Sequence, residues 1–253
     1  MKLKSNHTGS VSFSDLQCQK AVSHLLIVKT GAAAFTTETI NVALQDGTGN
    51  QRKLVTLLKV RDVALISQFT NGYLSQTVLA GGLIKSCYLL ELNPDAAIDL
   101  KDETYLSIDM NNLVAASSYD VYGLESPLTE RAFLNYNSTV ISGTETQQKQ
   151  YSVGANAFEL GIRNNDSLAK LRLFYNNGAE VSYLPEELAA ITREINDITQ
   201  AADTLIEGDT LNQIILNGAA EMFYFPMVGV KSFEITTVGA IDCVFFLVNK
   251  EAF

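Results

Sequence analysis

The two histidines, His7 and His24, are the side chains best suited to acid–base or metal chemistry in this sequence. His7 lies in a polar N-terminal stretch, and His24 lies inside the apolar run AVSHLLIVK (Ala21–Lys29). Neither stands in an HxxxH or CxxC context, and no GxSxG turn supplies a serine nucleophile. A histidine inside an apolar strand is usually a hydrogen-bonded core or interface residue. The sequence therefore predicts no zinc site and no hydrolase triad.

The three cysteines, Cys18, Cys87 and Cys243, are far apart and form no CxxC pair. An odd count argues against a disulfide framework. Cys243 lies between the strand-like residues Asp242 and Val244, a context that favours a buried thiol over a nucleophile. We expect all three to be reduced apolar core residues.

The acidic residues give only weak candidates for chemistry. Asp46, in the turn DGTGN, and Asp95, in NPDAAID, could offer carboxylate oxygen to calcium, but no EF-hand spacing follows either. Glu186 and Glu187 begin a predicted helix, where the helix dipole explains them. We therefore predict no catalytic, cofactor-binding or metal-binding residue, no cofactor and no enzymatic activity.

The composition describes a globular chain with an acidic surface. Of its 253 residues, 47% are hydrophobic and only 18% are charged, with a net charge of −10. The low charged fraction suggests that partners cover much of the surface. The acidic balance repels phosphate and predicts no direct nucleic-acid binding. The sequence shows neither a long apolar run nor a signal-peptide h-region, so we expect cytoplasmic synthesis without ordinary secretion.

Most segments alternate apolar and polar residues with the period of a half-buried strand. In TYLSIDM, for example, Leu106, Ile108 and Met110 share one face. Two segments have helical spacing instead: Lys59–Phe69, and Pro185–Thr199, whose residues Leu188, Ile191, Ile195 and Ile198 form one apolar stripe. The remaining runs predict strands at Ala21–Lys29, Thr39–Gln45, Lys53–Leu57, Thr77–Ile84, Ser86–Leu92, Thr104–Met110, Ser118–Leu124, Phe158–Ile162, Ala169–Tyr175, Val181–Leu184, Thr210–Leu216, Met222–Val228, Ser232–Thr237 and Asp242–Asn249.

The order of these elements repeats. Each half has a strand, an Asx-Gly turn (Asp46-Gly47 or Asn177-Gly178), a return strand and then one helix. Glycine at Gly47 and Gly178 suits the positive φ of such turns. The Ser-, Thr- and Asn-rich stretch 129–150 reads as a connection between the halves.

The predicted fold is all-β, with two tandem jelly-roll β-sandwiches that each carry one short inserted helix. The expected organisation is an N-terminal arm at 1–20, a first jelly roll at 21–128, a connection at 129–150 and a second jelly roll at 151–253. Residues 1–20 could alternatively hold an early edge strand.

This organisation resembles the double jelly-roll major capsid proteins of tailless icosahedral bacteriophages with an internal membrane. The segments that carry the resemblance are LQDGTGNQRKLVTLLKVRDVALI, LFYNNGAEVSYLPEELAAI, SYDVYGLES and DCVFFLVNKE, within roughly Ala21 to Glu251. The resemblance lies in the order of elements and identifies no individual functional residue.

The resemblance implies a structural virion protein. Three chains would form a homotrimer whose six lobes fill a pseudo-hexagonal place in the shell. The implied partners are neighbouring capsomers, other capsid or vertex proteins, and an internal viral membrane approached by the N-terminal arm.

Two other functions stay open. The first is a phage spike, vertex or receptor-binding module built from the same sandwiches. The second is a glycan-active enzyme on a β-sandwich, whose acidic residues cannot be recognised from sequence because their separation depends on the fold. The absence of Trp disfavours a sugar-stacking platform.

Overall fold

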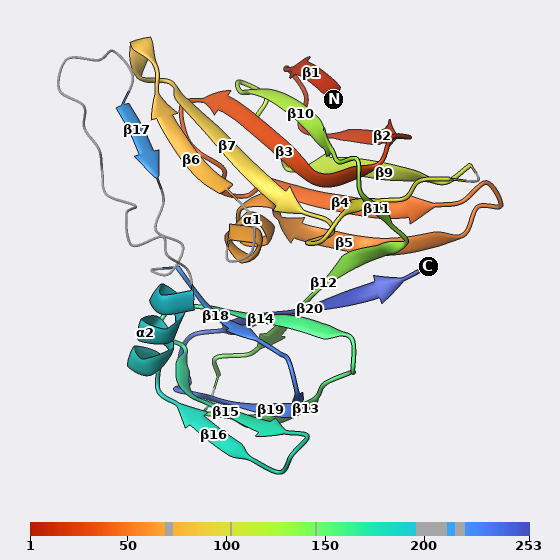
Figure 1. Cartoon of the computed structure of the whole chain (residues 1–253). Coiled ribbons are helices and arrows are strands. Elements are labelled where there is room, and N and C mark those ends of the chain that lie inside the picture. Colours follow the sequence, from red (N-terminus) through yellow and green to blue (C-terminus); the bar gives the residue numbers. More distant parts are fainter. Residues whose placement is uncertain (69–72, 102, 145, 196–211, 216–220) are drawn as a thin grey trace. The chain divides into compact units, whose positions relative to one another are not determined.

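The computed structural model describes residues 1–68, 73–101, 103–144, 146–195, 212–215 and 221–253 (Figure 1). The chain divides into two compact units. The first contains Met1–Asn135, the strand β17 and Glu251–Phe253; the second contains the described parts of Tyr136–Thr199 and Asn217–Lys250. Among the described residues, strands dominate both units and each unit has one α-helix, as predicted.

The first unit is a jelly roll. One of its sheets has the strand order β1-β10-β3-β7-β6-β17, and the other contains the run β2-β9-β4-β5. Without β6 and β17, these two sheets contain eight strands, which are, in chain order, β1, β2, β3, β4, β5, β7, β9 and β10. One sheet holds the first, eighth, third and sixth of them. The other holds the second, seventh, fourth and fifth, and this is the strand order of a jelly roll. The bounds of the unit's elements are β1 (Lys2–His7), β2 (Phe13–Cys18), β3 (Val22–Gly31), β4 (Thr39–Gln45), β5 (Gln51–Lys59), α1 (Val60–Gln68), β6 (Tyr73–Val78), the 3₁₀ turn η1 (Ala80–Gly82), β7 (Ile84–Glu91), β8 (Ala97–Ile98), β9 (Tyr105–Asn111), β10 (Ser118–Glu125), β11 (Thr129–Glu130) and β17 (Asn212–Ile215).

The second unit has the same topology. Its sheets have the orders β12-β20-β14-β18 and β13-β19-β15-β16, so the first, eighth, third and sixth strands again share one sheet. In both units the helix follows the fifth strand in this count. The bounds are β12 (Ala132–Ile141), β13 (Gln148–Ser152), β14 (Ala157–Arg163), β15 (Leu168–Tyr175), β16 (Glu180–Tyr183), α2 (Pro185–Ile195), β18 (Met222–Pro226), β19 (Val230–Thr237) and β20 (Cys243–Ala252).

The repeated hairpin that leads into each helix is closed by a left-handed glycine. Gly178 has a φ of 83° in the second unit, as predicted. In the first unit the left-handed residue is Gly49, with a φ of 88°, and not Gly47. The reason is the longer loop: the amide of Gly49 donates to the carbonyl of Asp46 over 3.1 Å.

The stretch 1–20 is not a free arm, so that prediction is wrong, and the alternative of an early edge strand is correct. The terminal ammonium of Met1 donates to the carbonyl of Gly123 over 2.6 Å. Strand β1 pairs with β10, and β2 pairs with β9. Phe13 and Cys18 are buried, which explains why this polar-looking segment is ordered against the sandwich.

The stretch 129–150 is not a simple connection either. It contains β11, β12 and the start of β13, and the border between the units falls inside β12, between Asn135 and Tyr136. Phe133, Leu134 and Tyr136 are buried. Their burial stabilises a strand that the surrounding Ser, Thr and Asn residues conceal in the sequence.

The predicted strand Thr77–Ile84 is interrupted. Gly81 and Gly82 have φ values of 81° and 76°, and they turn the chain from β6 into β7 through η1.

Helix α1 agrees with the prediction to within a residue and is buried nearly all round, including Val60, Val63, Ala64 and Ile66. Phe69, the last residue of the predicted helix, lies outside the described residues.

Helix α2 packs on the core of the second unit through Leu188, whose exposed fraction is 0%. Ile191 is partly buried against the same core. The side chains of Ile195 and Ile198 lie outside the described ones. The carboxylate of Glu187 accepts a hydrogen bond from the amide of Leu184 over 2.8 Å and so caps the start of the helix.

We predict that Leu188→Ala lowers the free energy of unfolding by about 2–5 kcal/mol, because it leaves a cavity under the helix. Urea denaturation followed by circular dichroism measures the change. Leu184→Ala is the matched control, since Leu184 is 51% exposed and should cost little. Equal effects of the two variants would contradict the packing described.

Candidate functional site

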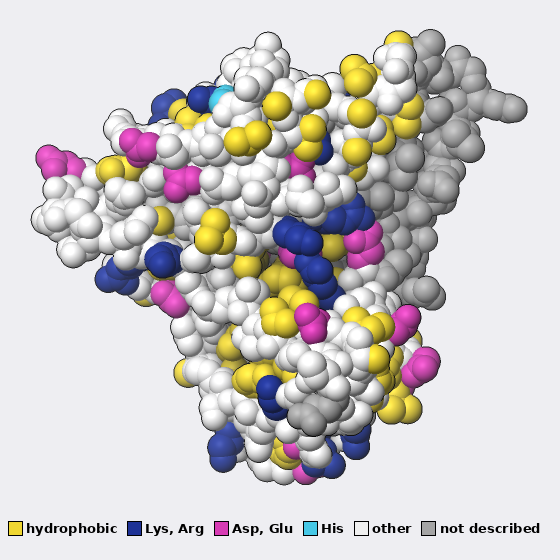
Figure 2. Space-filling model, turned by 180° about the vertical axis from the view of Figure 1, so that it is seen from behind, with side chains coloured by type: hydrophobic (Ala, Val, Ile, Leu, Met, Phe, Trp, Pro, Cys, Tyr) yellow, Lys and Arg dark blue, Asp and Glu magenta, His cyan; other side chains and the backbone are white. Residues whose placement is uncertain are grey.

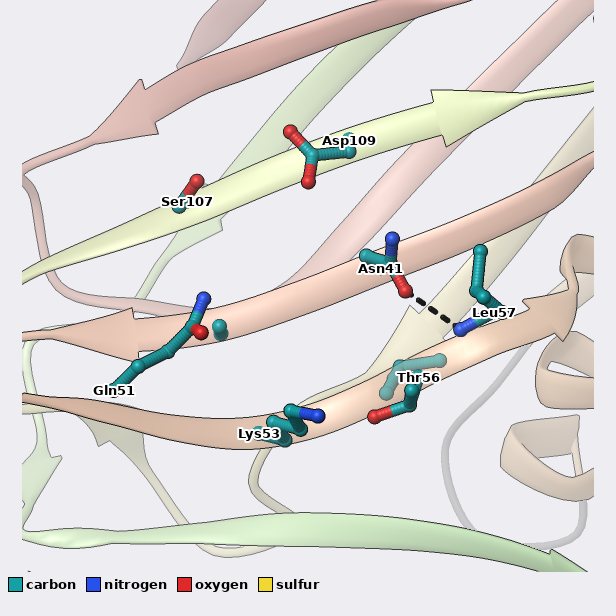
Figure 3. A pocket seen from close by; sticks show the side chains of 9 residues that line it. Asn41, Gln51, Lys53, Thr56, Leu57, Ser107 and Asp109 are labelled. Carbon is teal, nitrogen blue, oxygen red and sulfur yellow. Dashed lines mark hydrogen bonds between the residues drawn. The ribbon is translucent and has the colours of Figure 1, made fainter.

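A polar hollow lies on the outer face of the first unit, over strands β4, β5 and β9 (Figure 3). Its volume is about 320 Å³. The pleat of the strands explains its chemistry. Ile40, Val42 and Ile108 point into the core, so the alternate residues of the same strands point outward. The lining comprises Asn41, Ala43, Gln51, Lys53, Val55, Thr56, Leu57, Ser107 and Asp109.

A bulge in β5 shapes one side of the hollow. Leu57 has a φ of 49°, and the register between β4 and β5 shifts at Ile40/Val42. The amide of Leu57 donates to the side-chain carbonyl of Asn41 over 2.6 Å, the bond drawn in Figure 3. Asn41 lies opposite Asp109 across the β4–β9 ladder. A carboxylate oxygen of Asp109 accepts from the amide of Asp15 over 2.7 Å.

The hollow offers hydrogen bonds rather than covalent chemistry. Its lining supplies one carboxylate, one ammonium group, two amides and two hydroxyls, and it contains neither histidine nor cysteine. Acyl transfer needs a nucleophile in contact with a base, which this lining does not provide. The arrangement can hold a polar group, or a polar segment of a partner.

Two further hollows lie on outer sheet faces. One, of about 490 Å³, lies on β3, β6 and β7 and is lined mainly by Leu26, Leu89, Leu124 and Cys87 with hydroxyls. The other, of about 690 Å³, lies on the second unit beside Phe174 and Tyr175 and contains Gln150, Glu180 and Lys231. All three hollows are shallow features of sheet surfaces and are not enclosed cavities.

The sheet places the two histidines at opposite ends. His7 pairs with Tyr119 at the end of β1, and its ring meets that of Phe13 edge-on at 5.1 Å. His24 lies at the start of β3, where its Nε2 is 3.7 Å from a carboxylate oxygen of the buried Glu91. Burial lowers the pKa of His24. The histidines therefore do not converge on one site.

The cysteines are free thiols, as predicted. Cys18 and Cys243 are buried, and Cys87 is half-buried on a sheet face. Burial raises the pKa of each of these thiols, which favours the protonated form. A thiol in that form is a poor nucleophile.

The side chain of Asp46 accepts hydrogen bonds from residues of its own turn. One carboxylate oxygen accepts from the amide and the hydroxyl of Thr48, at 3.0 and 2.7 Å, and from the amide of Asn50 at 2.9 Å. These bonds lower the pKa of Asp46 to about 2. Asp95 lies in a separate turn closed by Asn93. Among the described residues, no three His, Cys, Asp or Glu side chains group as metal ligands would.

A buried ionic network in the first unit was not predicted. Lys29 and Glu38 are each 1% exposed, and the ammonium nitrogen lies 2.5 Å from a carboxylate oxygen. Lys29 also donates to the carbonyl of Ala34, and the hydroxyl of Tyr119 donates to Glu38 over 3.0 Å. The one sequence signal is a lysine that ends the apolar run AVSHLLIVK.

This network holds a connection in place and leaves no ligand position. The second carboxylate oxygen of Glu38 accepts from the amides of Thr36 and Thr37. Burial opposes ionisation of Glu38, but the bonds from Lys29 and Thr36 outweigh it and lower the pKa of this carboxyl. Burial, reinforced by the charge of Glu38, raises the pKa of Tyr119 to about 12.

Helices of the described chain are short, and none has the length and apolar character needed to cross a bilayer.

Comparison with known proteins shows no family for this chain. No protein-family model matches the sequence, and no curated protein matches it. Among solved structures, the chain is similar to the major capsid protein P2 from bacteriophage PM2, with 10% identity, a TM-score of 0.48, and coverage of 100% of this chain and 96% of that one.

Two other solved structures are similar to this chain with lower TM-scores. The PBSX exported protein XepA has 10% identity and a TM-score of 0.26, with coverage of 99% of this chain and 86% of that one. The turret protein A223 of Sulfolobus turreted icosahedral virus has 9% identity and a TM-score of 0.22, with coverage of 96% and 93%.

Proposed function

We propose that this chain is a structural virion protein, a major capsid protein whose homotrimers tile an icosahedral shell. The observation that carries the proposal is the duplication: one eight-strand topology, with a helix after its fifth strand, occurs twice in a single chain. The PM2 protein to which the chain is similar is itself a major capsid protein.

Duplication links the fold to assembly through symmetry. Two similar sandwiches per chain become six lobes around a three-fold axis. Six lobes can occupy a six-coordinated lattice point while the trimer keeps its own symmetry. A permanent trimer interface should bury more than about 2,000 Å² and be more apolar than its rim.

The proposed role is structural and not catalytic. The polar hollow supplies hydrogen-bonding groups, which suit contact with a polar segment of a partner. We also propose that this chain does not bind the genome directly, because its net charge of −10 repels the phosphates of nucleic acid. Because residues 1–20 are built into the first sandwich, they do not form an arm that reaches a membrane.

Sedimentation velocity of the purified chain over a range of concentration and salt tests the proposal. We expect a trimer at micromolar concentration and closed or sheet-like assemblies at higher concentration, visible by negative-stain electron microscopy. A protein that stays monomeric under all these conditions would overturn the capsid function and favour a solitary binding module.

A further inference from the structure

The fifth strand of the first jelly roll, β5, is paired on its outer side with a strand from further along the chain. In its sheet, β5 lies between β4 and β12, and the first residues of β12, Ala132–Asn135, belong to the first unit. The side-chain amide of Asn135 donates to the carbonyl of Lys53 in β5 over 2.5 Å. Because β12 is also the first strand of the second jelly roll, the chain covers the edge of one jelly roll with the strand that begins the next.

The fifth strand of the second jelly roll, β16, has no such cover among the described strands. It ends its sheet, with β15 as its one neighbour (Figure 1). Its residues Glu180–Ser182 are exposed, and the side chains of Val181 and Leu184 are 36% and 51% exposed. An uncovered strand edge presents backbone N–H and C=O groups to any strand that can pair with it.

The hairpin register shows which groups of β16 face this open side. The amide of Tyr175 in β15 donates to the carbonyl of Ala179 over 2.9 Å. Bonded and non-bonded pairs alternate along an antiparallel ladder. Counting from Ala179, Val181 therefore bonds to β15, whereas Glu180 and Ser182 do not. The backbone N–H and C=O of Ser182 consequently point away from β15.

The first strand of the first jelly roll, β1, is the counterpart of β12 and also has an open side. It ends its sheet, with β10 as its one neighbour among the described strands. The backbone groups of Met1 and Gly123 bond to each other in both directions, at 2.6 and 2.8 Å. By the same alternation, the backbone groups of the next residue, Lys2, point away from β10.

We propose that β1 of a second copy of this chain pairs with β16, as β12 pairs with β5 within the chain; the inference rests on the proposed assembly function and adds the contact that joins the copies. Each jelly roll then receives, on its fifth strand, the first strand of the next jelly roll. Because the two edges differ, the contact is head-to-tail, and such contacts close into a ring when the rotation between copies allows it. In a trimer, every jelly roll is then linked to the next by the same kind of strand pair.

The side chains near the two edges carry charges of opposite sign. The stretch 176–187 contains acidic residues and no Lys or Arg, whereas the stretch 1–12 contains lysines and no Asp or Glu. Figure 2 shows acidic and hydrophobic side chains side by side at the lower right, on the side where α2 lies in that view. The charged residues of the two stretches are Glu180, Glu186, Glu187, Lys2 and Lys4.

Neighbouring strands offset part of this charge difference. Asp120 and Glu125 of β10 lie 3.0 and 3.7 Å from the ammonium groups of Lys2 and of the chain terminus, and Arg172 of β15 lies 3.0 Å from the carboxylate of Glu180. The attraction between the edges therefore depends on the charges that remain. Those that form no ion pair within the described part of the chain are Lys4, Glu186 and Glu187.

A proline in β16 tests the pairing. Ser182→Pro removes the outward N–H and places a ring on the open side, while the bonds of Val181 and Tyr183 to β15 stay in place. Ser182→Thr is the matched control, because it keeps the N–H. Thermal melting confirms that both variants are folded, and sedimentation velocity measures the concentration at which trimers form. We expect Ser182→Pro to raise that concentration at least about tenfold and Ser182→Thr to change it less than about twofold. Equal assembly of the two variants overturns the inference.

Amide hydrogen exchange of the unaltered chain reports on both edges at once. Peptides that cover Glu180–Tyr183 and Lys2–His7 should exchange more slowly in the trimer than in the dilute monomer, because pairing protects both strands. Strand β13, which also ends its sheet but is assigned no partner, should exchange equally in the two states. Slower exchange at only one of β16 and β1, or at neither, overturns the inference.

These outcomes separate the strand pairing from the function on which it rests. A trimer whose β16 and β1 stay unprotected leaves the capsid function intact and places the contact between copies elsewhere. A chain that stays monomeric at every concentration overturns the proposed function itself.

Discussion

Glu38→Gln is expected to lower the free energy of unfolding by about 3–5 kcal/mol, because it leaves the Lys29 ammonium buried without its counter-charge. The pair has no compensating access to water, since both side chains are at most 1% exposed. The substitution also weakens the acceptor for Tyr119 and for the amides of Thr36 and Thr37. Urea denaturation at pH 7 measures the loss.

The control removes a surface pair of the same chemistry. Lys101→Met breaks the ion pair with Asp99, in which the Lys101 side chain is 69% exposed, and should cost no more than about 1 kcal/mol. The double variant Lys29→Met/Glu38→Gln should lose less stability than the sum of its single variants, since neither charge is then left buried alone. Additive losses in this cycle would mean that the two groups do not interact.

The buried network of Lys29 and Glu38 also predicts that the free energy of unfolding depends on pH in the acid range. The pKa of Glu38 in the folded protein lies below its value in the unfolded chain, which is about 4.3 for an ordinary glutamate. Its contribution is therefore complete above that pH and is lost as the pH falls through the lowered pKa. The unfolding free energy of the wild type should fall more steeply in acid than that of Glu38→Gln; parallel curves would contradict this assignment.

Phe233→Ala is expected to cost about 3–5 kcal/mol in the second unit. Phe233 lies in β19 and is 0% exposed. Its ring stacks on Tyr151 at 5.2 Å and meets Phe245 edge-on at 5.5 Å, so the three aromatic rings join both sheets of that sandwich. Removing the ring leaves a cavity that strands on either side cannot readily close.

Phe174→Ala is the matched control, since Phe174 lies on the outer face of the neighbouring strand β15 and opposes Ser232. Its ring is partly exposed and contacts the Arg172 guanidinium at 5.9 Å, an interaction worth about 0.5–1 kcal/mol. Chemical denaturation should separate the two variants clearly. A loss at Phe174→Ala that equals the loss at Phe233→Ala would mean that the inner and outer faces of β15 and β19 are wrongly assigned.

The fold was predictable where local signals agree. Pro185, Glu186 and Leu188 each favour a helix start within four residues, and α2 begins at Pro185. The duplicated hairpin and helix likewise depend on neighbours in sequence. Strand β12 was missed because Asn135, Ser138 and Thr139 look like a connection, and only pairing with distant strands makes Phe133 and Tyr136 core residues.

The candidate sites were not predictable, because they depend on contacts between distant residues. The polar hollow joins Asn41, Lys53 and Asp109 from three strands, and its shape depends on the positive φ of Leu57.

The order in which the ribosome delivers the chain now has a consequence for how the first sandwich matures. All eight of its jelly-roll strands have been synthesised once Glu125 is made, so the ladder between β1 and β10 can close early. The edge of β6 must wait for β17, about 130 residues later. A nascent chain therefore displays an uncovered β6 edge until Asn212–Ile215 have been made.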